Sequence, residues 1–360
     1  MELSDQSPAA VEQWFLRLLG RPSTVEEAAR FGSLDFPALV AAITDLPEYR
    51  NRFRDAEPTN PNALAAAHMW PLDRRDYDLQ VVVISSEGLS KCRATLDRII
   101  QEKGPRTLVT LLCADAEDGE LLSAPDTEHL VVPGVSVFEL RALLPTILKE
   151  VGWVALMEDH AVPHQGWIGA AEAAVRAAGR DQVALTAQVT NVLSTSSWSW
   201  ASFLFNFAYH WYPAAAAELP GTVTTLVFRR DLVGRRPLAV HAFEHTILGR
   251  RGVVPAEMVV DHNQPLSWWT ASLHTYENGR VTGSALRRHH IAPRRAMMEM
   301  VKWVNVGRIR EIGALLDRHP QRTKLPPGTL ARLRWISACH GLGIVVGAII
   351  GGGPSHRNLE

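Results

Sequence analysis

Three polar side chains that can bind a metal ion, Glu158, Asp159 and His160, directly follow the apolar run 153–157. The apolar run is typical of a buried strand, and a charge left unpaired at the end of such a strand is costly. Carboxylate and imidazole groups together suit a divalent ion. The three residues alone are equally compatible with a structural cap on the following turn, a hydrolytic metal site, and a site that holds a divalent ion against a nucleotide diphosphate.

Alternating strands and helices must position these side chains. Short β-branched or apolar runs predict strands within 80–84, 107–113, 129–134 and 153–159, with helices at 89–100 and 136–152 between them. We expect Pro145 to kink or divide the second helix. This alternation predicts an α/β fold with a mixed, mostly parallel sheet and helices on both faces. Ligands of such sheets bind at the carboxyl ends of the strands, where Ser85, Glu87 and Asp115 also lie.

The second half of the chain continues the pattern. An alanine-rich helix after residue 168 precedes a single strand within 182–193 and an aromatic helix within 196–213. A loop and strand follow in 218–234, and residues 242–252 are expected to form a short helix capped by Gly252. A last strand ends at Asp261 and His262.

Bulk properties exclude several classes of protein. The chain has 360 residues, of which 46% are hydrophobic, so it can bury a sizeable core. Its net charge of −1 does not favour nucleic-acid binding. The three cysteines have no paired spacing, which favours a reducing compartment. The first residues lack a basic region followed by an apolar core, so we expect no secretory signal there.

Composition divides the chain into four regions. Residues 1–55 predict a small helical module, 56–79 a linker rich in proline, 80–288 the main α/β domain, and 289–360 a C-terminal helical region.

The C-terminal region contains a long apolar segment. Residues 335–353 contain no Asp, Glu, Lys or Arg, and Gly343, Gly347 and Gly351 repeat at every fourth position. Such a repeat favours close packing of helices. Two interpretations stay open: a buried core or subunit-contact helix, and a segment that lies on or dips into a membrane.

Two segments together resemble family 2 glycosyltransferases of the GT-A fold. They are QVVVISSEGLSKCRATLDRII, from residue 80, and ELRALLPTILKEVGWVALMEDHAVPHQGWI, from residue 139. In that family an acidic motif follows a strand and is itself followed by a proline, a glycine and a tryptophan, as in MEDHAVPHQGW here. The resemblance extends over residues 80 to about 285. The N-terminal FLRLLGRPSTVEEAARF is similar to a small helical module found in bacterial proteins.

The resemblance implies a nucleotide-sugar donor and a divalent metal. Glu158 takes the position that faces the ribose and His160 the position that ligates the metal, with Asp159 between them assigned to both. His262 is placed to complete the metal site. Imidazole ligands favour Mn²⁺ over Mg²⁺.

Around this centre the resemblance implies contacts to the nucleotide and to the acceptor. Ser85 and Glu87 would contact the base and ribose, and Asp115 the edge of the base. Glu244 or His245 would act as the base of an inverting reaction. Gly221 would line the acceptor loop, and Trp198 and Trp200 would offer flat rings to a sugar.

The resulting hypothesis is a metal-dependent, inverting glycosyltransferase with a lipid-linked or polysaccharide acceptor. We expect a cytoplasmic protein, peripheral to the cytosolic face of a membrane, without a nucleic-acid partner. A homodimer through the C-terminal glycine-rich helix is a further expectation. The alternative is a catalytically degenerate module of the same fold that binds a sugar or a partner. A metal hydrolase is weaker because the sequence has no HExxH motif.

Overall fold

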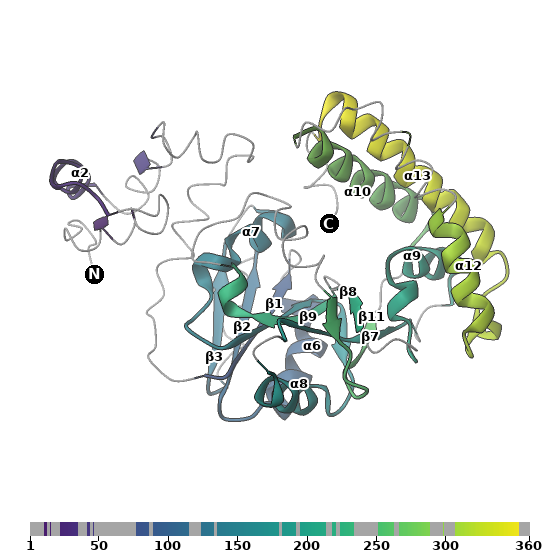
Figure 1. Ribbon diagram of the computed structural model, residues 1–360, viewed down its shortest axis with the longest axis horizontal. Coiled ribbons are helices and arrows are strands. Elements are labelled where there is room, and N and C mark those ends of the chain that lie inside the picture. Colours follow the sequence, from purple (N-terminus) through teal and green to yellow (C-terminus); the bar gives the residue numbers. More distant parts are fainter. Residues whose placement is uncertain are drawn as a thin grey trace.

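A computed structural model gives the structure of the chain. It describes residues 22–34, 77–85, 89–114, 124–132, 135–179, 182–191, 195–213, 218–220, 224–233, 251–262, 266–288 and 307–352, together with positions 11, 12, 15, 42, 43, 46 and 298. Within this part the predicted fold class is confirmed, because a large mixed sheet carries helices on both faces and an apolar helix lies near the C-terminus (Figure 1).

Among the described residues the main sheet has eight strands, in the order β3-β2-β1-β4-β9-β6-β10-β8. Strands β3, β2, β1 and β4 are parallel, whereas β9 is antiparallel to both β4 and β6. Every residue of β1 and β2 is buried, which explains their continuous apolar sequences. The bounds are β1 Leu79–Ser85, β2 Thr107–Cys113, β3 Thr127–Val131, β4 Trp153–Glu158, β6 Ala184–Thr186, β8 Glu218–Pro220, β9 Thr225–Arg229 and β10 Arg251–Val253.

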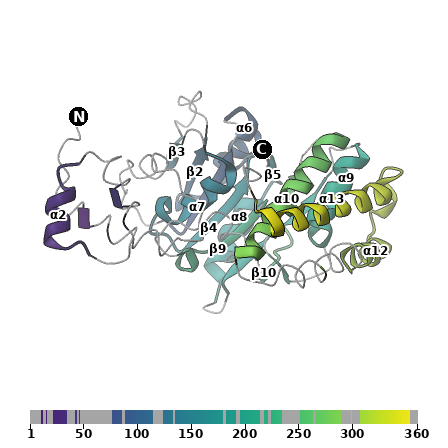
Figure 2. The same cartoon turned by 90° about the horizontal axis from the view of Figure 1, so that it is seen from above.

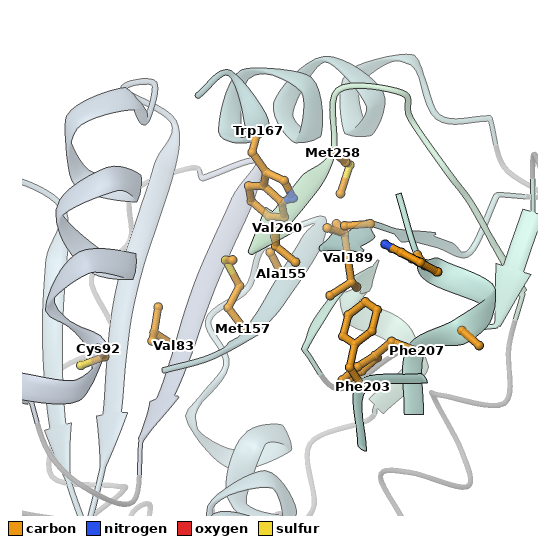
Figure 3. Packing of buried hydrophobic residues seen from close by; sticks show 14 of the residues in the cluster. Val83, Cys92, Ala155, Met157, Trp167, Val189, Phe203, Phe207, Met258 and Val260 are labelled. Carbon is orange, nitrogen blue, oxygen red and sulfur yellow. The ribbon is translucent and has the colours of Figure 1, made fainter. Parts of the chain in front are cut away.

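Three of the described helices cover the main sheet. Helices α6 (Leu89–Glu102) and α8 (Trp167–Ala177) pack on the face that presents Val83 and Met157, together with Trp167 of α8 itself (Figure 3). Helix α7 (Val137–Ile147) packs on the opposite face. Pro145 does not divide this helix, since it lies in the last turn and the helix ends two residues later.

The segment 182–193 was expected to form one strand, and that prediction is wrong. It forms two, which separate at the buried Ala187: β6 joins the main sheet, and β7 (Gln188–Thr190) joins a second, three-stranded sheet. The second sheet has the order β5-β11-β7, with β5 Ala161–Pro163 and β11 Val259–His262.

Gly252 does not cap a helix, contrary to the sequence prediction. It lies within β10, and a Cβ atom there would lie 3.0 Å from the carbonyl carbon of Leu185 and 3.1 Å from the nitrogen of Thr186. The glycine therefore allows β10 to pair closely with β6.

Four of the described helices, all from the second half of the chain, gather on the side of the molecule away from α2 (Figure 1). They are α9 (Ser197–Phe207), α10 (Trp268–Arg288), α12 (Arg308–Arg318) and α13 (Thr329–Ile350), and α13 packs against both α9 and α10. Three short 3-10 turns complete the described elements: η1 Ala208–His210, η2 Arg230–Val233 and η5 Arg322–Lys324.

Glycines bring α10 and α13 together along their length. A Cβ atom at Gly343 would lie 2.0 Å from the carbonyl oxygen of Tyr276, and one at Gly347 would lie 1.9 Å from that of Arg280. Higher numbers on α13 contact higher numbers on α10, so the two helices run parallel. This intrachain contact occupies the glycine face that the sequence analysis offered to a second copy of the chain, so that part of the homodimer prediction is corrected.

Helix α2 (Val25–Phe31) is the described helix of the N-terminal module. The Oγ1 atom of Thr24 accepts a hydrogen bond from the backbone N–H of Glu27, and the Glu27 carboxylate accepts one from the Thr24 N–H. This reciprocal pair of hydrogen bonds is a capping box, which fixes the start of the helix. Most of the module and most of the predicted linker lie outside the described residues.

Candidate metal centre

Two strand ends bring Glu158, His160 and His262 together. Glu158 is the last residue of β4, His160 lies in the turn that leads into β5, and His262 is the last residue of β11. Strand β5 pairs antiparallel with β11, and its first residue, Ala161, stands opposite His262. This register places His160 beside His262, although the two residues are 102 positions apart.

The three side chains present their donor atoms to one point. His160 Nε2 lies 2.9 Å from His262 Nε2, and these nitrogens lie 3.8 Å and 3.7 Å from Glu158 Oε2. All three donor atoms lie within 4.8 Å of one another. Ligands held about 2.1 Å from one ion at tetrahedral or octahedral angles are separated by roughly 3.0–3.4 Å. The triangle is therefore close to the size that one divalent ion requires.

The donor set also suits a metal chemically. Two Nε2 atoms that face each other at 2.9 Å can share one proton or can both direct lone pairs at an ion. Nitrogen and carboxylate donors suit Mn²⁺ or Zn²⁺ better than Mg²⁺. These three residues fit a transition-metal ion.

Asp159 supports the centre from behind. Its Oδ1 lies 2.6 Å from His160 Nδ1, and its Oδ2 accepts a hydrogen bond of 2.8 Å from Ser85 Oγ. A carboxylate on the outer nitrogen of a metal-binding histidine fixes the ring and its tautomer. The expectation that Asp159 is a metal ligand is therefore corrected: Glu158 supplies the carboxylate of the triangle, and Asp159 orients His160.

Thr95 of α6 fixes the backbone on either side of His160. Its hydroxyl lies 2.9 Å from the carbonyl oxygen of Asp159 and 3.2 Å from that of Ala161. Thr95 and Ser85 are both fully buried. The turn is therefore held by groups from β1 and α6 before any ligand binds.

Glu158 has two further partners that the sequence analysis missed. Arg141 of α7 donates from Nη2 to Glu158 Oε1 at 3.0 Å, and Thr224 donates from Oγ1 to Glu158 Oε2 at 3.1 Å. Arg141 is buried within the apolar sequence LRALLPTI. A lone arginine on an apolar helix was the signal that could have revealed a buried ionic partner.

The charges in this cluster shift the pKa values in different directions. Burial opposes the charged form of Glu158, but the neighbouring His262 and the charges on His160 and Arg141 outweigh it and hold the pKa of this carboxyl well below its usual range. Burial likewise opposes the charge on His160, yet Asp159 and Glu158 raise its pKa. Burial and the charge on His160 lower the pKa of His262.

The structure describes three of the remaining predicted site residues: Ser85, Trp198 and Trp200. Ser85 lies at the carboxyl end of β1 as expected. Trp200 is buried and packs edge-on against Phe203 and Trp211, so it belongs to the core and the expectation that it stacks on a sugar is wrong. Trp198 is partly buried beneath the guanidinium of Arg332. The predicted residues that lie outside the described part of the chain are Glu87, Asp115, Gly221, Glu244 and His245.

A second histidine–carboxylate pair lies on the same small sheet. His164 Nε2 lies 2.9 Å from Asp261 Oδ1, and Thr190 also donates to this oxygen. Asp261 precedes His262, so its side chain points to the opposite face of β11. His164 is not part of the metal triangle and provides a natural control for His160.

The fold and the cluster define a mixed α/β protein with a candidate divalent-metal centre at the carboxyl end of β4. No family model matches the sequence, and no curated protein matches it. Several solved structures share a loose similarity of fold. The mannosyltransferase PcManGT from Pyrobaculum calidifontis, in complex with GDP-Man and Mn²⁺, is 13% identical with a TM-score of 0.41, over 88% of this chain and 99% of that chain.

Two further structures overlap less. S. aureus TarS 1-349 is 12% identical, with a TM-score of 0.37, over 75% of this chain and 90% of that one. GalNAc-T7 with UDP, GalNAc and Mn²⁺ is 11% identical, with a TM-score of 0.35, over 62% of this chain and 53% of that one.

Proposed function

We propose that this protein is a metal-dependent glycosyltransferase that takes a sugar from a nucleotide-sugar donor. The observation that carries the proposal is the triangle of Glu158, His160 and His262, supported from behind by Asp159. It lies where parallel strands β1 and β4 end, which is the edge at which α/β sheets bind nucleotides.

Each residue of the cluster has a defined task in this proposal. Glu158, His160 and His262 would hold the ion, whose charge would offset the negative charge of a leaving nucleoside diphosphate. Arg141 holds the Glu158 carboxylate in position and keeps it ionised. Asp159 holds the His160 ring, and Ser85 holds Asp159.

The finer parts of the proposal rest on the sequence. We propose an inverting reaction with Glu244 or His245 as the base that deprotonates the acceptor hydroxyl. The acceptor would be lipid-linked or a polysaccharide, and the protein would act at the cytosolic face of a membrane. Manganese is the preferred ion because two of its three protein ligands are imidazoles.

The first test is donor binding by the purified full chain. Thermal unfolding would be recorded with UDP-, GDP- and dTDP-sugars, each with and without MnCl₂, for the wild type, His160→Ala and His164→Ala. We expect one nucleotide to raise the melting temperature only with Mn²⁺, in the wild type and in His164→Ala but not in His160→Ala. No response to any nucleotide from the folded wild type would refute the proposal.

A matched experiment separates an enzyme from a binding module of the same fold. Release of the free nucleoside diphosphate from the donor that binds would be measured by chromatography, with and without candidate lipid-phosphate and oligosaccharide acceptors. Release that depends on Mn²⁺ and on an acceptor would establish a transferase. Metal-dependent binding without release in any acceptor mixture would favour the degenerate sugar-binding module.

A further inference from the structure

Exposed apolar side chains concentrate on the two C-terminal helices. Among the described residues, eleven large hydrophobic side chains are exposed, and seven of them lie on α10 and α13. These seven are Trp268, Trp269, Leu330, Trp335, Leu342, Ile349 and Ile350. Such a concentration marks an interaction surface rather than the scatter that any protein surface shows.

Helical geometry aligns part of this set. Trp335, Leu342 and Ile349 are spaced by seven residues, so they share one face of α13, and the glycines Gly343 and Gly347 face α10 instead. We call the exposed side chains of these three residues the α13 stripe. Both views place α13 on the outside of the molecule, beside α10 (Figures 1 and 2).

Tryptophans flank one end of the stripe. Trp335 donates from its indole N–H to Ser272 Oγ at 2.9 Å, and the Ser272 hydroxyl donates to the carbonyl oxygen of Trp268. Trp268 and Trp269 are both at least half exposed at the start of α10. Tryptophan is the residue that concentrates at the boundary between lipid and water.

The segment that leads into the stripe carries an excess of positive charge. Residues 307–352 contain seven Arg or Lys residues and two Asp or Glu residues, in a chain whose net charge is −1. Exposed basic residues of this region are Arg310, Arg318, Arg322, Lys324 and Arg334. From residue 335 to residue 350 the chain carries no charged side chain. A basic end followed by an apolar face complements an anionic lipid surface.

The packing of α13 indicates how it meets a membrane. Among the described helices, α13 alone is long and apolar enough to span a bilayer, and half of its most apolar window is buried within the protein. Its partner α10 runs beside it and carries Glu277 and Arg280, which a spanning arrangement would carry into the hydrocarbon. An orientation in the plane of the interface leaves these charges on the protein side.

A second copy of the chain is a poorer partner for the stripe. A twofold contact between identical surfaces would bring the two basic ends near each other or stack them on the partner's apolar face, and neither arrangement supplies opposite charge. Anionic headgroups supply that charge directly.

From these observations we infer that the α13 stripe, with Trp268 and Trp269, is a docking surface for an anionic phospholipid bilayer on which α13 lies flat. This inference does not depend on the proposed transferase activity. It would hold the metal centre near a membrane and would suit an acceptor that resides there.

Vesicle flotation of the full chain tests the inference. Vesicles of phosphatidylcholine alone would be compared with vesicles that contain phosphatidylglycerol as well. We expect binding to the anionic vesicles, which weakens in high salt because screening shortens the reach of the basic residues. The double variant Leu342→Gln/Ile349→Gln is expected to lower partitioning by at least about tenfold, since each side chain loses its apolar burial in lipid.

Two control variants separate apolar from electrostatic binding. Val25→Gln changes an exposed aliphatic residue of α2 away from the stripe and is expected to bind like the wild type. Arg310→Gln/Arg334→Gln is expected to weaken binding to anionic vesicles by roughly fivefold per charge, about 25-fold in all, and to leave any binding to neutral vesicles unchanged.

Several outcomes would overturn the inference. One is a folded wild type that floats with neither kind of vesicle, and another is equal binding by the stripe variant and the wild type. A wild-type dimer in light scattering that Leu342→Gln/Ile349→Gln converts to a monomer, without vesicle binding, would assign the surface to a second copy. Donor binding by thermal unfolding is recorded on the same samples, so a failure of membrane docking is distinguishable from a failure of the proposed function.

Discussion

The metal centre and the α10–α13 helix pair both depend on close approach, but they achieve it by opposite means. At the centre, charged and polar side chains converge, with His160, Asp159 and Glu158 at separations of 2.6–3.8 Å from their partners. Between the helices, Gly343 and Gly347 have no side chain, so the backbone of α13 contacts the backbone of α10 directly. The first region is therefore specified by chemistry, and replacing its residues alters metal binding and the pairing of buried charges. The second is specified by volume, and its residues are replaced at a cost in folding.

The largest expected effect is on the helix pair. Gly343→Leu places a side chain where a Cβ atom alone would lie 2.0 Å from a backbone oxygen. Because backbone cannot move aside as a side chain can, we expect a loss of about 3–5 kcal/mol in the free energy of unfolding, measured by urea denaturation. Gly313→Ala on α12 is the control, since nothing lies within 4 Å of a Cβ there, and it is expected to be neutral or to stabilise by up to about 1 kcal/mol. Equal effects of the two changes would show that α10 and α13 do not pack through these glycines.

The next largest effect is expected when the buried charge partner of Glu158 is removed. Arg141→Met leaves the Glu158 carboxylate buried without its guanidinium, and we expect a loss of roughly 3 kcal/mol of stability. Much of this loss should be recovered in Arg141→Met/Glu158→Gln, because the uncompensated charge is gone. Arg106→Met breaks an exposed ion pair with Asp78 and should cost less than about 1 kcal/mol. A loss no larger in Arg141→Met than in Arg106→Met would contradict the buried pair.

The helix region also contains a buried titratable group. Burial, with a contribution from the charge on Arg308, lowers the pKa of His340 from 6.5 to about 4. Between pH 6.5 and pH 4 the unfolded chain therefore binds a proton at this residue that the folded chain does not. Stability is lost as pH falls through this window, by up to roughly 3 kcal/mol from His340.

His340→Gln should remove this contribution and flatten the dependence of the unfolding free energy on pH between 6.5 and 4. Denaturation curves of the variant and the wild type at matched pH values measure the difference. Parallel curves over that window would mean that His340 titrates normally in the folded protein.

The smallest expected effect lies behind the metal centre. Ser85→Ala removes the hydroxyl that donates to Asp159, at a cost of about 1 kcal/mol in stability. It should also weaken Mn²⁺ binding by up to about tenfold, because Asp159 then orients His160 less firmly. Calorimetry on Ser85→Ala, with His164→Ala beside it, would show whether this support extends to the metal. An unchanged affinity would restrict Ser85 to a structural role.

The ends of the strands could be predicted from the sequence more accurately than the packing of distant segments against one another. Strands β1 and β4 are continuous apolar runs that end in polar residues, so their ends and the positions of Ser85 and Glu158 could be predicted. His262 was also located correctly at a strand end. What the sequence could not give is the β5–β11 pairing that brings His262 to His160, since that register depends on contacts a hundred residues apart.

Three other features could not be predicted from the local sequence, because each depends on contacts with distant parts of the chain. The break at Ala187 sends β6 and β7 to different sheets, yet the sequence around it alternates without interruption. The glycine repeat of α13 correctly indicated close helix packing, but its partner is α10 of the same chain rather than another copy. Trp200 was predicted to face a sugar but is buried in the core. The residue type alone does not distinguish an aromatic side chain in a core from one in a binding site.

The central claim is that Glu158, His160 and His262 bind one divalent ion. Isothermal titration of Mn²⁺ into the wild type, His160→Ala and His164→Ala tests it most directly, since both variants lose a histidine that contacts an aspartate. The account predicts one Mn²⁺ per wild-type chain, an affinity at least about tenfold lower in His160→Ala, and near wild-type affinity in His164→Ala. Equal Mn²⁺ affinity in all three proteins, or no binding by the folded wild type, would contradict it.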